Sequence, residues 1–499
     1  MERQSGILMP VFSLPTDYGI GDFGKSAYKF IDYLSQSGQK VWQVLPLVQT
    51  GYGNSPYSSV SSQSFNPYFI SPELLKEQGL ITKAELEFSR SKSKYINYGE
   101  LYAVRYPLLR SAFNRYDKKD KAFRKYITSK ESLDYALFMA IKFASGQKHF
   151  YEWDEPLKRR DERALSSFKK SYKEEILFWQ FVQFTAKTQW FNLKKYANEK
   201  GVQIMGDMPL YVALDSVDVW VNPELFKLDD NFNPKKVAGV PPDYFSEDGQ
   251  LWGNPVYDYI EHNRTSFAWW TQRIKRALTT YDYVRIDHFR GLDRYYEVEP
   301  NRTDAKIGEW IDVPSEDLFN AIHSEVDKDR IIAEDLGIID DGVSELLKWT
   351  GYPGMKILSF AFDGQKNNLY LPENIEENSV CYTGTHDNDT LKGLIEQMSE
   401  WDYNNLINGV SNSLKALKQR GDVSAKDNLI DAIITLGMHS KSKLFIMPMQ
   451  DLLHKGTEYR INEPGTVKEQ NWSIKLDNSD FNANSKAKLL RLTRQSNRI

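Results

Sequence analysis

Eight short apolar runs, separated by longer polar stretches, constrain the fold of this chain more than any other feature. Most of the runs are apolar on both faces, as expected for parallel strands that are covered on both sides. Amphipathic segments with helical spacing lie between several of them. The runs are 7–14, 40–47, 203–209, 283–289, 330–336, 355–362, 379–383 and 443–449, and the helical segments are 25–37, 266–279, 315–326 and 424–440. This alternation predicts an α/β fold, a (β/α)8 TIM barrel, in which chemistry lies at the carboxyl ends of the strands.

Two stretches between the runs are too long to be ordinary connections. Residues 51–200 are rich in Lys and Glu and have helical patterns at 132–144 and 172–198, so they predict a mainly helical insertion after the second strand. Residues 211–263 are rich in Pro, Gly, Asp and Trp, and they predict a loop-rich insertion or lid over the active face. The whole chain, 1–499, is therefore expected to be one catalytic barrel with two insertions.

The balance of charges and the cysteine count exclude several classes of protein. Lys and Arg number 64 against 68 Asp and Glu, a net charge of −4, so neither a nucleic acid nor an anionic membrane surface is an expected partner. A single cysteine excludes an internal disulfide and a cysteine-rich metal cluster. No run approaches the ~20 apolar residues of a membrane span, and no secretory signal is recognisable at the N-terminus. A cytoplasmic location is the resulting expectation.

A phosphate-binding motif offers one alternative function. Residues 19–26, GIGDFGKS, satisfy the pattern G-x-x-x-x-G-K-S of the P-loop, whose backbone N–H groups cradle phosphate. Asp22, however, places a carboxylate among those amides, and residues 15–18 separate the motif from the preceding run. Both features speak against a P-loop, but the pattern itself is complete, so a nucleotide-binding protein remains the alternative of another class.

Acidic residues lie at the ends of two neighbouring runs. In 283–291, YVRIDHFRG, Arg285 and Asp287 share one face of a strand, so the guanidinium is expected to lower the pKa of the carboxyl. An ionised carboxylate is what a glycosidic nucleophile must be. In 330–337, RIIAEDLG, Glu334 follows three apolar residues, and burial would raise its pKa as a general acid requires. A structural Arg–Asp pair and a helix cap are the alternatives.

A third acidic motif follows the seventh run. In 382–390, YTGTHDNDT, His386 and Asp387 are candidates to hydrogen-bond sugar hydroxyls and to hold a distorted sugar ring. The alternative is a helix N-cap cluster, a role that suits Asn388 and Asp389. A barrel brings all three motifs to one rim, and glycoside cleavage needs two carboxylates of different pKa on opposite sides of the bond.

Two aromatic loops fit a flat, neutral ligand such as a sugar ring. Aromatic residues make up 13% of the chain, and more than half of them are expected in the core. Tyr52 and Tyr57, in GYGNSPYSS, and Trp252, in the Pro- and Gly-rich stretch 239–255, instead lie among turn residues. Sugar rings stack on such aromatic faces, although an ordinary long connection is the alternative for 239–255.

Metal and thiol chemistry find little support in the sequence. The chain contains neither H-E-x-x-H nor G-x-S-x-G, and Cys381 lies within an apolar run, where packing explains it. His288 and His386 are the histidines that lie beside candidate carboxylates, so they are the alternative metal ligands. No metal and no cofactor are expected.

Together these motifs resemble the 4-α-glucanotransferase family, the amylomaltases or disproportionating enzymes of glycoside hydrolase family 77 in the α-amylase-like clan. The resemblance runs from end to end and includes the P-loop match, which weakens the nucleotide alternative. The segments that carry it are SLPTDYGIGDFG (13–24), WQVLP (42–46), SPYSS (55–59), GDMP (206–209), DSVDVW (215–220), residues 241–255, RIDHFRG (285–291), AEDLG (333–337), GTHDNDT (384–390), RINEPGT (460–466) and NW (471–472).

The resemblance implies a role for each candidate residue. Asp287 would be the nucleophile, Glu334 the general acid and base, and Asp387 the stabiliser of the transition state. The sugar contacts implied by the resemblance or by the loops are Tyr57, Asp207, Arg285, His386, Tyr52 and Trp252. The family lacks the separate C-terminal β domain of amylases, and the 50 residues after the last run (450–499) are too few to hold one.

The expected function is that of a retaining 4-α-glucanotransferase. Such an enzyme moves a segment of α-1,4-glucan, or maltooligosaccharide, to the 4-hydroxyl of an acceptor glucan or glucose through a covalent glycosyl-aspartate. An α-1,4-glucan hydrolase with the same carboxylates would also fit these motifs, and so would a catalytically silent glucan-binding protein. The sequence predicts neither chain-length preference, cyclic products nor oligomeric state.

Overall fold

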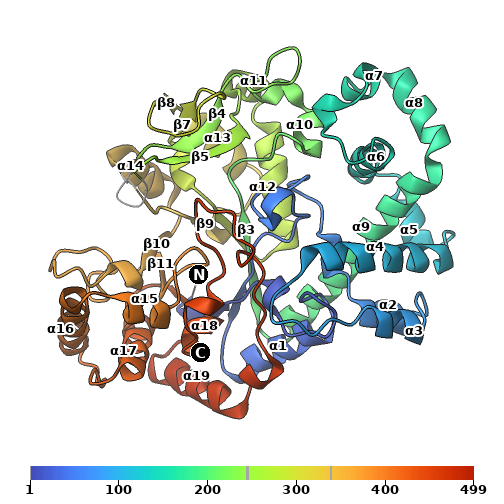
Figure 1. Ribbon diagram of the computed structural model, residues 1–499. Coiled ribbons are helices and arrows are strands. Elements are labelled where there is room, and N and C mark those ends of the chain that lie inside the picture. Colours follow the sequence, from blue (N-terminus) through green and yellow to red (C-terminus); the bar gives the residue numbers. More distant parts are fainter. Residues whose placement is uncertain (1, 243–246, 338–339) are drawn as a thin grey trace.

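The computed structural model describes residues 2–242, 247–337 and 340–499 (Figure 1). Its centre is an eight-stranded parallel sheet in the order β10-β11-β12-β1-β2-β3-β6-β9. The strands are β1 (Gln4–Leu8), β2 (Val41–Gln43), β3 (Gln203–Met208), β6 (Tyr283–Ile286), β9 (Ile331–Ala333), β10 (Gly354–Ile357), β11 (Ser379–Tyr382) and β12 (Leu444–Pro448). The N–H of Ala333 donates to the carbonyl of Pro353, directly before β10, at 3.0 Å, so the two ends of the sheet meet. Each apolar run contains or overlaps one of these strands, although β1 begins three residues before the run 7–14 and β10 one residue before the run 355–362, and the predicted barrel is confirmed.

The parallel register sets where the motif residues leave the sheet. Asp207 of β3 pairs with Arg285 of β6, and Ile286 pairs with Ala333 of β9. Because Asp287 and Glu334 each follow these paired residues, both leave the sheet at its carboxyl edge. The strands are shorter than the apolar runs that predicted them, and the last residues of those runs form the rim.

Helices cover the outside of the barrel, and their spacing explains why they pack there. In α1 (Lys25–Gln36), Ala27, Phe30, Ile31 and Leu34 follow the spacing of one helix face, and all four are buried. The other helices of the barrel and of the C-terminal part are α12 (Ala268–Thr280), α13 (Ser315–His323), α14 (Asp341–Thr350), α15 (Leu391–Gln397), α16 (Glu400–Ala416), α17 (Lys426–His439), α18 (Met449–Leu452) and α19 (Ala483–Gln495). None of the helices in the described residues is long and apolar enough to cross a bilayer. The cytoplasmic location stays a prediction.

Residues 51–200 contain eight helices that extend to one side of the barrel (Figure 1). They are α2 (Pro72–Glu77), α3 (Lys83–Phe88), α4 (Tyr98–Arg115), α5 (Lys121–Tyr126), α6 (Lys130–Ala144), α7 (Glu155–Lys158), α8 (Glu162–Ser171) and α9 (Lys173–Glu199). The 27-residue helix α9 leads from these helices back to the barrel and precedes β3. Its buried Trp190 donates from Nε1 to the carbonyl of Thr280 at the end of α12, at 3.0 Å. This bond joins α9 to α12, the two helices that precede neighbouring strands of the barrel.

A second, four-stranded antiparallel sheet is a feature that the sequence patterns did not indicate. Its order is β5-β4-β7-β8, and it combines two strands from the loop-rich stretch 211–263 with two that follow β6. The strands are β4 (Val237–Val240), β5 (Gln250–Pro255), β7 (Arg294–Val298) and β8 (Gly308–Asp312), and the stretch also contains α10 (Val217–Val221) and α11 (Tyr259–Arg264). The sheet has a small core of its own, formed by Val237, Tyr296, Val298 and Ala305. Residues 243–246, part of the expected lid, lie outside the described residues.

Candidate active site

Arg285 is a buried cation at the centre of the acidic cluster. Its Nη1 donates to both carboxylate oxygens of Asp207 at 2.7 Å and to Oδ1 of Asp287 at 2.9 Å. Its Nη2 lies 4.0 Å from Oε2 of Glu334. One guanidinium therefore contacts or approaches three carboxylates that come from β3 and from the ends of β6 and β9. The structure brings these four sequence-predicted residues together at the carboxyl edge of the barrel.

Backbone hydrogen bonds fix the Glu334 carboxylate in place. The N–H of His288 donates to Oε2 at 2.7 Å, and the N–H of Leu336 donates to Oε1 at 2.8 Å. His288 has a φ of 49°, in the left-handed region that non-glycine residues rarely adopt. This turn, directly after Asp287, aims the His288 N–H at Glu334. The chain segment that carries one candidate catalytic carboxylate thus positions the other.

Burial dominates the electrostatics of both carboxyl groups. It raises the pKa of Asp287 well above its ordinary value; Arg285 opposes this shift, while the charge of Asp207 adds to it. Burial also raises the pKa of Glu334, against Arg285 and the two backbone N–H groups. Arg285 thus has the lowering effect expected of it, but the expectation that the pKa of Asp287 would end below its ordinary value is wrong. It ignored burial, and it ignored that Arg285 shares its charge with Asp207.

The third motif forms the other wall of the site. Asp387 accepts a hydrogen bond from Nδ2 of Asn462 at 2.6 Å, and its backbone carbonyl accepts one from Nη2 of Arg460 at 2.7 Å. Its side chain is 41% exposed, whereas His386 beside it is buried. Burial lowers the pKa of His386, which keeps its ring neutral. Asp387 is thus held in place yet open to a ligand.

Tyr57 joins the two walls. Its hydroxyl donates to Oδ2 of Asp207 at 2.7 Å, and its ring stacks on that of His386 with centroids 5.2 Å apart and planes within 10°. Trp472 packs against both rings, at 5.8 Å from each. Tyr57 therefore lies at the site, where the sequence placed it. Its hydroxyl contacts Asp207, and its ring packs against the rings of His386 and Trp472.

Trp252 and Tyr52 are the remaining aromatic candidates, and the structure describes the side chain of Trp252 alone. Trp252, in β5 of the second sheet, is 37% exposed and meets the ring of His288 edge-on, with centroids 4.8 Å apart. It thus reaches the segment that carries Asp287 and that holds Glu334. Tyr52 lies in a short 3-10 turn, Tyr52–Asn54, and its side chain lies outside what the structure describes.

Three further acidic or amide side chains of the motifs hydrogen-bond to groups within the protein. Asp335 accepts from the N–H of Met355 at 2.5 Å, and Asn388 accepts from the N–H of Thr385 at 2.8 Å. Asp389 accepts hydrogen bonds from the side chains of Gln397 at 3.0 Å and Thr457 at 2.8 Å. Their contacts are structural, but the N-cap of α15 is Thr390, so the N-cap role expected for Asn388 and Asp389 is not the one they have.

Asn462, Arg460 and Trp472 contact the site although the sequence patterns assigned them no role in it. All three lie in the irregular segment 460–474, which has no strand or helix periodicity. The signal that pointed to this segment was the family-like motif RINEPGT at 460–466 and the Asn-Trp pair after it.

The P-loop match does not form a phosphate cradle. The carboxylate of Asp22 itself accepts the N–H of Gly24 at 2.8 Å. The ammonium of Lys25 lies 3.0 Å from Glu77, and the hydroxyl of Ser26 donates to the carbonyl of Pro15. The groups that would hold phosphate are therefore engaged within the protein.

Comparison with known proteins agrees with this geometry. A model of the 4-alpha-glucanotransferase family matches residues 9–480 of the chain. The chain belongs to this family. A 4-alpha-glucanotransferase of Clostridium butyricum is 42% identical over 493 residues, which cover 97% of this chain and 99% of the relative. A 4-alpha-glucanotransferase of Thermus thermophilus is 38% identical over 509 residues and covers all of both chains.

Solved structures show the same likeness. An amylomaltase from Streptococcus agalactiae in complex with acarbose superposes with a TM-score of 0.94 at 39% identity, over 100% of both chains. An amylomaltase from Corynebacterium glutamicum, 19% identical, has a TM-score of 0.81 over 99% of this chain and 75% of that one, which shows the shared fold. The resemblance seen in the sequence is confirmed, and the chain is an enzyme of the 4-alpha-glucanotransferase class.

Proposed function

We propose that this 4-alpha-glucanotransferase is a retaining enzyme that moves segments of α-1,4-glucan to the 4-hydroxyl of a glucan or of glucose. The observation that supports this proposal most directly is the position of Arg285. It contacts Asp287 at 2.9 Å while its other terminal nitrogen lies 4.0 Å from Glu334. Two carboxylates at one rim, unequally placed around a cation, suit the two different roles of glycoside cleavage.

The unequal contact bears on which of the two carboxyl groups, Asp287 or Glu334, is protonated. Both have raised pKa values, so the pair tends to retain a proton. The direct hydrogen bond from Arg285 favours the ionised form of Asp287, whereas Glu334 is farther from the guanidinium. The proposal places the shared proton on Glu334, because the nucleophile must be ionised and the general acid must carry a proton.

In the first step, a carboxylate oxygen of Asp287 forms a bond to the anomeric carbon, and the bond to the glycosidic oxygen breaks. Glu334 gives its proton to that oxygen, so the leaving glucan departs as an alcohol. Positive charge develops on the sugar ring in the transition state, and the exposed carboxylate of Asp387 stabilises it. Asp207, with Arg285 and the neutral His386, holds the ring at the cleavage point.

In the second step, Glu334 takes the proton of the acceptor 4-hydroxyl as the acceptor oxygen displaces Asp287. The number of glycosidic bonds is conserved, so transfer over hydrolysis is a kinetic preference. Trp252, partly exposed beside His288, is placed to retain an acceptor sugar and to keep water from the glycosyl-enzyme. An α-glucan hydrolase with the same carboxylates would lack this preference.

Incubation with maltotriose tests the proposal. Transfer produces glucose and longer oligomers while the total of reducing ends stays constant, whereas hydrolysis increases that total. The Asp287→Asn variant should show neither reaction, because an amide does not form the ester. A rise in reducing ends that matches the glucose formed would assign the enzyme to hydrolysis instead.

A further inference from the structure

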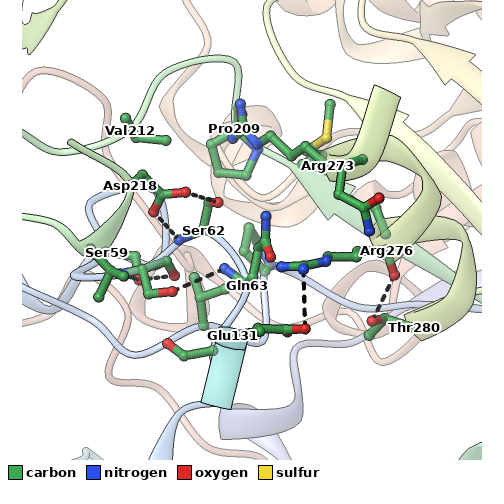
Figure 2. Close-up of a pocket in the computed structure, with 18 of the residues that line it drawn as sticks. Ser59, Ser62, Gln63, Glu131, Pro209, Val212, Asp218, Arg273, Arg276 and Thr280 are labelled. Carbon is green, nitrogen blue, oxygen red and sulfur yellow. Dashed lines mark hydrogen bonds and ion pairs between the residues drawn. The ribbon is translucent and has the colours of Figure 1, made fainter. Parts of the chain in front are cut away.

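A cavity of about 690 Å³ opens between α9 and α12, beside the barrel and apart from most of the active-site residues. We refer to it as the side cavity. It is bounded by these two helices, by the N-terminal end of α6, and by the loop 59–65 after β2 (Figure 2). Its volume lies in the range of pockets that hold small-molecule ligands.

The inner end of the side cavity reaches the catalytic rim. Tyr57 and Asp207 line it, and these are the residues that contact His386 and Arg285 on their other sides. Tyr211, which follows β3, also lines the cavity, and its ring lies 6.0 Å from that of Trp252. A ligand in the side cavity would therefore touch residues that the active site uses.

The charges that line the side cavity are balanced and mostly engaged. Arg276 of α12 pairs with Glu131 of α6 at 3.1 Å, as Figure 2 shows. Asp218 accepts from both the N–H and the hydroxyl of Ser62, at 2.8 and 2.6 Å. Asp134 accepts from Arg160 at 2.7 Å. Four cationic and five acidic residues line the cavity, so its net charge is small and a neutral, polar ligand fits it.

Two buried polar groups in the lining lack a hydrogen-bond partner among the described residues. They are the hydroxyl of Tyr211, in a residue 7% exposed, and Nε of Arg273, in a residue 2% exposed. The two terminal nitrogens of Arg273 donate to the carbonyls of Leu210 and Pro209, at 2.8 and 2.5 Å. Both atoms are themselves shielded from solvent, so they lie behind the surface of the cavity, and the amide side chains of Gln63 and Gln272 in the lining are the polar groups available to a ligand.

Aromatic rings and an outward extension complete the cavity. Phe191 of α9 and Tyr126 of α5 line it, and both are half-buried. A surface groove of about 470 Å³ along α9 shares Phe191 and Thr279 with the side cavity, so the space continues toward solvent. Aromatic faces beside hydroxyl and amide groups are what a sugar ring recognises, and the extension leaves room for more than one ring.

We propose that the side cavity is a second saccharide-binding site, which takes a short neutral saccharide of the maltooligosaccharide type. The identity of the ligand rests on the proposed function, whereas the polarity and the aromatic lining come from the cavity itself. The site shares Tyr57 and Asp207 with the catalytic rim but lies outside Asp287, Glu334 and Asp387.

Equilibrium binding of maltotriose to the Asp287→Asn variant tests this proposal, because this variant should bind the sugar without consuming it. Calorimetry is expected to resolve two classes of site. Adding Phe191→Ala should weaken one class about tenfold and leave the other unchanged, because a stacking surface is lost. Tyr196→Ala is the matched control, since Tyr196 is also half-buried on α9 but lines neither the side cavity nor the groove, and its ring packs on Tyr28 instead.

A single class of site, or equal effects of Phe191→Ala and Tyr196→Ala, would overturn the second site. Ala277→Phe, which fills the cavity from α12, is a second variant if Phe191→Ala does not fold, and it should remove the same class. Failure of the proposed function is distinguishable, because it would appear in the wild-type enzyme as maltotriose that stays unchanged or is only hydrolysed, whatever the binding experiment gives.

Discussion

At Arg285, one positive charge is divided between two carboxylates, and this division sets the properties of Asp287. Asp207 takes two hydrogen bonds from the guanidinium, and Asp287 takes one. The negative charge of Asp207 therefore both competes for Arg285 and raises the pKa of Asp287. The sequence showed the Arg285–Asp287 pair through its spacing of two, but the third partner comes from a strand 78 residues away.

The Asp207→Asn variant tests this division of charge. The amide has nearly the shape of the carboxylate but no charge, so the pKa of Asp287 should fall. Activity requires ionised Asp287 and is lost as the pH drops through its pKa, so the acid limb of the kcat/KM profile should move to lower pH. Because a buried sugar contact is altered as well, kcat/KM at the optimum should fall about a hundredfold. An acid limb that stays in place or moves upward would contradict the argument.

Glu334→Gln tests the role of the second carboxyl. The amide donates no proton to the leaving oxygen, so transfer from maltotriose should fall by about 10²–10⁴. A donor such as α-maltosyl fluoride, whose leaving group needs no proton, should restore most of the first step. Release of fluoride measures that step directly. Equal losses with both donors would remove Glu334 from the role of general acid.

At the scale of elements, the barrel was predictable and the second sheet was not. The barrel strands are buried on both faces, so each leaves a continuous apolar run in the sequence. β5, by contrast, reads QLWGNP and keeps Trp252 and Gly253 exposed, so Gly and Pro suggested a loop. The strand-end carboxylates were predictable for the same reason as the barrel, whereas Asn462 lies in a segment without periodicity.

The second sheet places Trp252 where it touches the catalytic segment, and Trp252→Ala tests that contact. The ring packs edge-on against His288, whose N–H holds Glu334. Removing it should weaken acceptor retention and admit water, so the ratio of hydrolysis to transfer should rise about tenfold. Reducing-end assays beside the oligomer profile measure the ratio. Trp401→Ala, at an exposed position of α16 outside the second sheet, serves as control.

In the whole molecule, the carboxyl rim of the barrel carries the candidate catalytic residues, whereas hydrogen bonds at the amino rim hold the ends of the strands together. Arg498, near the C-terminus and fully buried, donates to the carbonyls of Met438, Gln4 and Ser442 at 2.7, 2.7 and 3.0 Å. Gln4 begins β1, and Ser442 lies just before β12, the strand that pairs with β1. The last residues thus join neighbouring strands at the face opposite the active site, where residues serve stability.

Arg498→Met should therefore separate stability from catalysis. The thioether fills much of the space but donates no hydrogen bond, so several buried carbonyls lose their partner at a cost of about 3 kcal/mol. Thermal unfolding should shift to a lower Tm, while kcat/KM for maltotriose at 25 °C stays near the wild-type value, because the substitution lies at the far end of the strands. Arg494→Met, on the exposed side of α19, is the matched control and should leave the Tm unchanged. A loss of activity in proportion to the loss of stability would contradict this separation. It would mean that the hydrogen bonds of Arg498 at the amino rim influence Asp287 at the carboxyl rim through the strands that connect the two.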